Sequence, residues 1–420
     1  MKSNFRTTVV VFGFAIMLSR QLATAAEPKT SDLDALVSRH QWGSLRDALA
    51  GHDHAPFYQG AVAAAFNDAD QAQRLFQVVI AAAPMSELAY QAHSILAGMY
   101  LRLGQYRLAL GQADAMLAIK PDNVSDREGR ALLVALSQAP DQTVRRRAPS
   151  HIQGVSKDGG NPALPMMLNG HPVNYVIDGN ANISSISESD AQRAGLKFHE
   201  LPAGATKISG VTGMEISYRV AVAETVIIGN IELANVAFLV FPDDQQPWVE
   251  MPPGARGAVG VSVLVALRTC RWNQDDSVEA GFPGKAQNLR DANLWFDGPN
   301  IITDVQFHES RISMLFDTGS EATDFWPPFA AEFGRVVDES GQNDSKKLSG
   351  IGHDLVMDTK TLSDVTLKVG GYITVLRSAH ILLKPTVRGS TWFFGRLGFD
   401  LLHQARHATL DFESMTLKLE

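Results

Sequence analysis

Apolar and small residues recur with helical spacing over the first third of the chain, from about 31 to 136. The spacing is clearest between Tyr90 and Pro121, where such residues stand at Leu96, Ala97, Tyr100, Ala109, Ala113 and Leu117. Gly104 and Tyr106 lie in the middle of this stretch, and Pro121 follows its last apolar position. Because proline is excluded from helix interiors, the pattern predicts two helices that meet near Gly104 and end before Pro121.

Small residues on facing helices allow a close antiparallel approach, and an aromatic side chain can fill the gap between the two helices. In these features the stretch resembles a tetratricopeptide repeat. A weaker copy precedes it, with Gly60, Ala72, Phe76 and Pro84 in comparable places. The resemblance implies a stack of helical hairpins over residues 27–140, and a protein partner that binds the repeats. A generic helical bundle is the alternative interpretation.

The second part of the chain has a different pattern. Short β-branched and aromatic runs alternate with turn residues every eight to twelve positions, as at Val173–Ile177, Val220–Ile228, Val236–Phe241 and Ile373–Leu376. This alternation predicts an all-β region. A stretch rich in helix breakers, from Gln138 to Gly160, separates it from the helices, and we expect residues 141–160 to form a linker. The fold class expected is therefore multidomain, an α module followed by all-β domains.

The β region contains the same series of features twice. An apolar strand runs into Asp178 in one copy and into Asp317 in the other. A glycine-bearing loop follows, centred on Gly210 or Gly350, at a separation of 32 or 33 residues from the aspartate. A Gly-x-x-Gly-x-x-x-Leu segment comes later, at Gly257–Leu264 and at Gly395–Leu402. Three features in register indicate a duplicated unit, with one lobe over 161–285 and a second over 286–420.

The first 26 residues have the order of a secretory signal peptide. Lys2 and Arg6 precede an apolar run from Val9 to Leu18, and small residues follow at 23–26. This run is shorter than the roughly 20 residues of a membrane span. We therefore expect export to the periplasm or the extracellular space, with no membrane span in the mature chain. Retention of the segment as an uncleaved anchor is the alternative.

Charge and cysteine content restrict the function further. The whole chain has a net charge of −8, and removal of residues 1–25, which hold three basic and no acidic residues, makes it −11. An acidic chain without a large basic cluster argues against a nucleic-acid partner. Cys270 is the sole cysteine, so neither an intramolecular disulfide nor a cysteine-based metal cage can form.

The second copy carries the most specific motif. Asp317-Thr318-Gly319-Ser320 follows the apolar strand Met314–Phe316, and Gly395–Leu402 and a closing strand Ala408–Phe412 follow at the expected distances. Together with the duplication, this resembles the retropepsin-like and pepsin-like aspartic proteases, in the bacterial form that fuses two lobes behind tetratricopeptide-like helices. The resemblance covers roughly residues 150–420 and implies a bilobal pair of β-barrels.

The resemblance also implies roles for residues. Asp178 and Asp317 would form a dyad that shares one proton and activates a water molecule for peptide-bond hydrolysis. Thr318 would brace the two lobes, and Gly319 and Ser320 would shape the turn around the carboxylate. Two flaps would close over a peptide or protein substrate, and no metal or organic cofactor is implied. The flap residues expected are Gly210, Val211, Thr212, Gly213, Gly350, Ile351 and Gly352.

The first copy departs from this family pattern. Gly179 stands where threonine or serine belongs, and Asn180 stands where glycine belongs. Gly179 has no hydroxyl for the bond between the lobes, and it adds backbone freedom beside Asp178. An aspartic-type endopeptidase, weakened by this altered triplet, is the function that the sequence favours. The alternative is a catalytically impaired periplasmic protein that uses the repeats and the cleft to bind peptides or as a scaffold.

Overall fold

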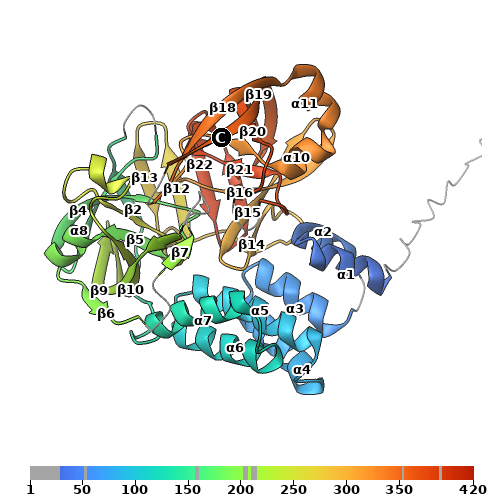
Figure 1. The fold of residues 1–420 in the computed structure, drawn as a ribbon, viewed down its shortest axis with the longest axis horizontal. Coiled ribbons are helices and arrows are strands. Elements are labelled where there is room, and N and C mark those ends of the chain that lie inside the picture. Colours follow the sequence, from blue (N-terminus) through green and yellow to red (C-terminus); the bar gives the residue numbers. More distant parts are fainter. Residues whose placement is uncertain are drawn as a thin grey trace, which may run out of the picture.

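The computed structural model describes residues 29–51, 54–156, 160–201, 207–209, 215–351, 354–386 and 390–420. The expected signal segment 1–26 lies outside these residues. Within them, an α-helical part precedes a region built from β-strands, as the sequence predicts (Figure 1). None of the helices in the described ranges is long and apolar enough to cross a bilayer.

The N-terminal part is a row of helices in which each packs on the next (Figure 1). Side chains of Asp68, Ser86 and Asn123 accept backbone N–H groups at the starts of three of them, which satisfies donors left free at a helix N-terminus. Gly104 has φ +69°, a conformation that favours glycine, and it makes the predicted turn. The described helices are α1 (Thr30–Ser38), α2 (Trp42–Leu49), α3 (Pro56–Ala65), α4 (Ala69–Ala82), α5 (Glu87–Arg102), α6 (Tyr106–Ile119) and α7 (Val124–Leu136).

Two eight-stranded sheets follow, one in each half of the β region. The first has the order β1 (Thr143–Arg146), β10 (Ile231–Phe241), β5 (Ser184–Ser187), β11 (Gly257–Val259), β4 (His171–Ile177), β3 (Leu164–Leu168), β9 (Arg219–Ile228) and β6 (Lys197–His199). The second has the order β14 (Leu294–Asp297), β15 (Asn300–Phe307), β16 (Ser310–Phe316), β21 (Gly395–Leu397), β17 (Asp324–Phe325), β20 (Tyr372–Leu382), β19 (Asp354–Val369) and β18 (Gln342–Ser349). The four strand runs expected from the sequence lie in β4, β9, β10 and β20.

Short helices connect these strands. They are α8 (Glu188–Arg193), the 3-10 helix η1 (Trp248–Glu250) and α9 (Val261–Leu267) in the first half, and α10 (Pro327–Glu332), α11 (Gly334–Ser340) and α12 (Phe399–Leu402) in the second. A separate two-stranded hairpin consists of β7 (Lys207–Ser209) and β8 (Glu215–Ser217).

A further five-stranded sheet joins the two halves. Its order is β2 (Ser150–Gln153), β13 (Ser277–Ala280), β12 (Thr269–Asn273), β22 (His407–Asp411) and β23 (Thr416–Leu419). The two halves are therefore hydrogen-bonded to each other through β12 and β22. The expected linker 141–160 is not a free connection, because β1 pairs with β10 and β2 pairs with β13. Its backbone donors and acceptors are thus used in two sheets.

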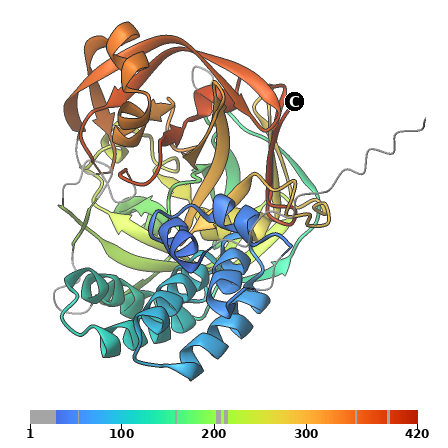
Figure 2. The same cartoon turned by 90° about the vertical axis from the view of Figure 1, so that its right-hand side faces the viewer.

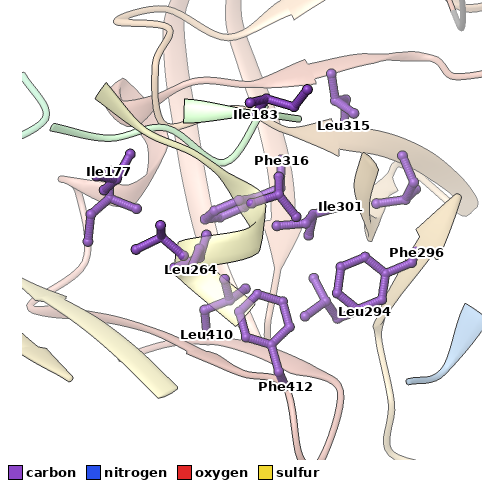
Figure 3. Packing of buried hydrophobic residues seen from close by; sticks show 14 of the residues in the cluster. Ile177, Ile183, Leu264, Leu294, Phe296, Ile301, Leu315, Phe316, Leu410 and Phe412 are labelled. Carbon is purple, nitrogen blue, oxygen red and sulfur yellow. The ribbon is translucent and has the colours of Figure 1, made fainter. Parts of the chain in front are cut away.

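One apolar core extends through these parts. Figure 3 shows Phe316, at the end of β16, surrounded by Leu264 of α9, Ile301 of β15 and Leu410 of β22, all of them buried. These neighbours come from both halves and from the joining sheet, so the strand that leads to Asp317 is fixed by contacts from the whole β region.

The helices lie against both β halves (Figures 1 and 2). Arg102 of α5 is buried and donates hydrogen bonds to the carbonyl oxygens of Gly298 (3.1 Å) and Ala64 (2.6 Å). Trp42 Nε1 donates to Asp297 Oδ1 at 2.8 Å. Tyr106 is buried and hydrogen-bonds to Ser262 of the first half. The helical part is thus packed on the β region through buried polar and apolar contacts, and it is not a separate module on a linker.

Substitution of Gly98 tests how tightly the helices pack on the β region. A Cβ at Gly98 would lie 2.7 Å from the Cα of Gly298, which is a backbone atom that cannot rotate away. We expect Gly98→Ala to destabilise the full chain by about 1–3 kcal/mol in urea unfolding, because the helix must shift from the turn between β14 and β15. Gly111→Ala is the matched control: this helical glycine in α6 has open space around it, and alanine should stabilise by up to about 1 kcal/mol. A stabilising effect of both changes would show a loose interface.

Candidate active site

The two aspartates follow equivalent strands. Asp178 follows β4 and Asp317 follows β16. The backbone N–H of Asp178 donates to the carbonyl of Val259 at 2.9 Å, and that of Asp317 donates to the carbonyl of Leu397 at 3.0 Å. Both acceptors belong to the parallel neighbour, β11 or β21. The two halves therefore present their aspartates in the same way.

The second glycine of each Gly-x-x-Gly segment makes the same kind of hydrogen bond in the two halves. The N–H of Gly260 donates to Ser184 Oγ at 3.0 Å, and the N–H of Gly398 donates to Thr323 Oγ1 at 2.9 Å. A Cβ at either glycine would overlap the backbone of the chain behind it. Glycine is required at both positions because the strand passes so close to the aspartate loop.

Each aspartate lies against the loop of the other half. A Cβ at Gly319 would be 2.5 Å from Asp178 Cγ, so only glycine leaves space for that carboxyl group. In the opposite direction, Asn180 Nδ2 donates to Asp317 Oδ2 at 3.2 Å. Asn180 occupies the position equivalent to Gly319 and places an amide where the other loop leaves a space. The predicted pair is thus brought together, with unequal surroundings.

Thr318 connects the two loops. Its hydroxyl donates to the carbonyl of Ile177 at 2.7 Å and accepts the N–H of Gly179 at 2.9 Å. The reciprocal contact is missing because Gly179 has no hydroxyl. Its place is filled instead, since a Cβ at Gly179 would be 2.8 Å from Cδ1 of the buried Phe316 ring and 3.1 Å from the Phe316 carbonyl oxygen. Only one half supplies a hydroxyl bond between the loops.

Asn161, which sequence reasoning missed, adds a second connection. Its Nδ2 donates to the carbonyl of Ile177 at 2.7 Å and to that of Thr318 at 2.9 Å, so one amide holds both loops. Asn161 precedes β3 at the start of the expected first lobe, and nothing in its local sequence marks it. Ser320 stabilises its own turn, where its hydroxyl donates to the carbonyl of Ala322 at 2.8 Å.

The bond network around Thr318 gives a direct prediction. We expect Thr318→Val, which keeps the shape and removes the hydroxyl, to destabilise the chain by about 1–3 kcal/mol, because the buried N–H of Gly179 loses its partner and the buried carbonyl of Ile177 loses one of its two donors. Urea unfolding measures this change. Thr318→Ser is the control and should retain most of the stability, since it keeps the oxygen. A loss of stability for serine with none for valine would mean that the methyl group, and not the hydroxyl, matters.

The two carboxyl groups differ in acidity. Burial and the nearby charge of Asp317 raise the pKa of Asp178 to about 7. The N–H groups of Asn180 and Ala181, which donate to Asp178 Oδ1 at 2.9 and 3.1 Å, act against this rise. Burial also raises the pKa of Asp317, but the Arg396 guanidinium, the Asn180 amide and the Ser320 N–H oppose it. Asp178 is therefore the carboxyl group whose protonated form is favoured, whereas the donors around Asp317 favour its ionised form.

The charged neighbour Arg396 was not recognised as a site residue from the sequence, although it lies in the glycine segment of the second half. Its Nη1 is 3.4 Å from Asp317 Oδ2. Its other side contacts Asp324, a buried carboxylate that also pairs with Lys346 of β18. The signal available in the sequence was an arginine within an otherwise apolar strand.

The structure describes only part of the expected flaps. Gly210, Val211, Thr212 and Gly213 lie outside the described residues, between the ends of β7 and β8, and so does Gly352. Gly350 and Ile351 are half-buried at the end of the hairpin formed by β18 and β19. Within the described ranges, no group of three or more His, Cys, Asp or Glu side chains is arranged to hold a metal ion.

Part of this site is similar to a known protein family. Residues 164–262, which include Asp178 and Gly260, match the family model for aspartyl protease. A solved structure of a retropepsin-like aspartic protease from Rickettsia conorii is 16% identical, and its alignment covers 33% of this chain and 92% of that chain with a TM-score of 0.22. No curated protein matches the chain. The family match supports an aspartic-protease-type domain in the first β half.

Proposed function

We propose that this chain is an aspartic-type endopeptidase with Asp178 and Asp317 as its catalytic pair. The observation that carries the proposal is the contact between each aspartate and the loop of the opposite half. This contact brings the buried carboxyl group of Asp317 and the partly buried carboxyl group of Asp178 close enough that the charge of Asp317 raises the pKa of Asp178. The aspartyl protease match over residues 164–262 supports the same chemistry.

The two carboxyl groups have different surroundings, and we propose a different role for each. Asp317, held as a carboxylate by donors from Asn180 and Arg396, would take a proton from the attacking water. Asp178, protonated below about pH 7, would donate a hydrogen bond to the carbonyl oxygen of the peptide bond as negative charge develops there. The proton taken from water then passes through the pair to the leaving amine.

The bilobal arrangement extends this proposal to the substrate. A peptide in extended conformation would lie across both aspartates, beneath the hairpins β7–β8 and β18–β19, which would close over it and exclude water. The helices would bind a protein partner through a tetratricopeptide-like surface.

The pattern of residues 1–26 supports export, and analysis of the mature N-terminus after expression in a bacterium tests for cleavage near residue 26.

A peptide-library cleavage assay between pH 3 and pH 7 tests the peptidase proposal. We expect cleavage products from the full mature chain and none from Asp317→Asn. Cleavage that survives in Asp317→Asn would assign the activity to a contaminant or to other residues.

A second candidate function is peptide binding without hydrolysis. Two observations favour it: the Asn180 amide lies on Asp317, and Phe316 fills the space of a hydroxyl on Gly179. Fluorescence anisotropy with the same library separates the two functions. Saturable binding without any cleavage supports the scaffold, and cleavage of the bound peptides supports the enzyme.

A further inference from the structure

Three charged side chains with little exposure, Lys346, Asp324 and Arg396, form a charged row next to Asp317 in the second half. Arg396 in β21 has a side chain that is only 13% exposed. Its Nη1 approaches Asp317 Oδ2 at 3.4 Å, while Nε and Nη2 donate to Asp324 Oδ2 at 3.1 and 2.9 Å. On the other side of Asp324, Lys346 Nζ donates to Oδ1. The guanidinium thus lies between a proposed catalytic carboxylate and a second buried carboxylate.

The first half has no such row, although its backbone is arranged alike. Arg396 is paired with Leu315 and with Asp324. The residue in the same register of the first half is Ala258, which is paired with Val176 and with Ser185. The position of Asp324 is therefore taken by Ser185, and that of Arg396 by Ala258. Because neither can carry a charge, the charged row makes the two halves electrically different at the dyad.

Other ionisable groups face this row from neighbouring elements. His380 of β20 is the strand partner of Asp324, and its pKa is lowered by burial and by the charge of Lys346. Asp344 of β18 lies 3.9 Å from His380. Asp400 of α12 bonds to Thr323 beside Asp324, and burial raises its pKa. Of these charges, only the Arg396 guanidinium contacts Asp317.

We propose that Arg396 is a positioning residue that keeps Asp317 ionised and leaves the shared proton on Asp178, and that Asp324 limits the strength of this effect. The inference deepens the proposed peptidase function and rests on it. An opposite charge within about 4–6 Å lowers a carboxyl pKa by about 1–3 units. Asp324 shares the same guanidinium, so it weakens the field at Asp317 while it holds Arg396 in place.

Two substitutions with opposite expected effects test the inference. Activity requires ionised Asp317 and is lost as pH falls through its pKa. Arg396→Met raises that pKa, so the acid limb of kcat/KM should move up by about one pH unit or more. Asp324→Asn removes the competing carboxylate, so the acid limb should move down. A merely structural role for the pair would lower activity in both variants without opposite shifts, and this result would overturn the inference.

A readout independent of turnover separates this inference from the peptidase proposal. In a full chain carrying ¹³C at aspartate carboxyl carbons, the Asp317 signal is identified by its loss in Asp317→Asn. Its titration midpoint should rise in Arg396→Met and fall in Asp324→Asn, whether or not any peptide is cleaved. Unchanged midpoints would overturn the role of Arg396, whereas absent cleavage with shifted midpoints would overturn only the peptidase proposal.

A second variant covers the case in which Arg396→Met does not fold. The double variant Arg396→Met with Asp324→Asn leaves the net charge of the row unchanged and removes two buried groups that depend on each other. Its Asp317 midpoint should also lie above that of the wild type, because the nearest cation is gone. A midpoint equal to the wild type would contradict the inference.

Discussion

Replacing Asp317 by asparagine should lower kcat/KM for a cleaved peptide by at least about 10³-fold, because an amide cannot accept the proton of the attacking water. Asp178→Asn should cause a loss of similar size. Arg396 retains Asp324 as its partner in the Asp317 variant, so we expect the fold to survive. Stopped assays with the peptide identified in the library screen measure both effects. Activity within tenfold of the wild type in either variant would remove that residue from the mechanism.

The pH dependence of the same variants separates catalysis from folding. The pKa of Asp178 is raised from 3.8 to about 7 in the folded chain, so protonation stabilises the fold. This contribution is complete below about pH 4 and is lost as pH rises through about 7, and peptidase activity should decline over the upper part of the same range. Asp178→Asn should therefore be more stable than the wild type at pH 8 by a few kcal/mol, on the order of the shift, with no gain at pH 3. A gain that does not depend on pH would have another cause.

Restoring a symmetric site should raise activity by about one to two orders of magnitude. The missing hydroxyl bond corresponds to about 0.5–1.5 kcal/mol and the freedom of glycine to about 0.5–1 kcal/mol, and each 1.4 kcal/mol is about tenfold in rate. The sequence alone suggests Gly179→Thr with Asn180→Gly. The structure adds a third change, because the Phe316 ring occupies the space of the new side chain. Phe316→Ile reproduces the other half, where Ile177 stands beside Thr318.

The comparison of variants makes this prediction specific. Gly179→Thr alone should destabilise the chain by about 1–3 kcal/mol through overpacking and should bring no gain in kcat/KM. The triple variant, with Gly179→Thr, Asn180→Gly and Phe316→Ile, should recover the stability and exceed the wild-type rate. Phe316→Ile alone is the control for the cavity that it leaves. If the triple variant folds and is no faster than the wild type, the altered triplet is not what limits the rate.

The sequence by itself determined that a helical part precedes a β region, and it located the two aspartate loops. The strand runs at Val173–Ile177 and Ile373–Leu376 form as predicted, since period and β-branching act over a few neighbouring residues. The repeat of aspartate and glycine in register also indicated which residues would meet. Gly319 and Gly260 stand where another chain segment passes too close for a Cβ, a constraint written into the residue type itself.

The tertiary structure alone decided what surrounds the two aspartates. Arg396 contacts Asp317, which is 79 positions away in the sequence, and Asn161 donates to the carbonyl of Thr318, which is 157 positions away. The ring of Phe316 occupies the space beside Gly179, and strands β1 and β2 turn an expected linker into parts of two sheets. These contacts join residues whose local patterns are unremarkable and which become neighbours only when strands pair. The pKa shift of a carboxyl group and the loss of stability on adding a side chain both depend on those neighbours. Both quantities are therefore set only in the folded chain.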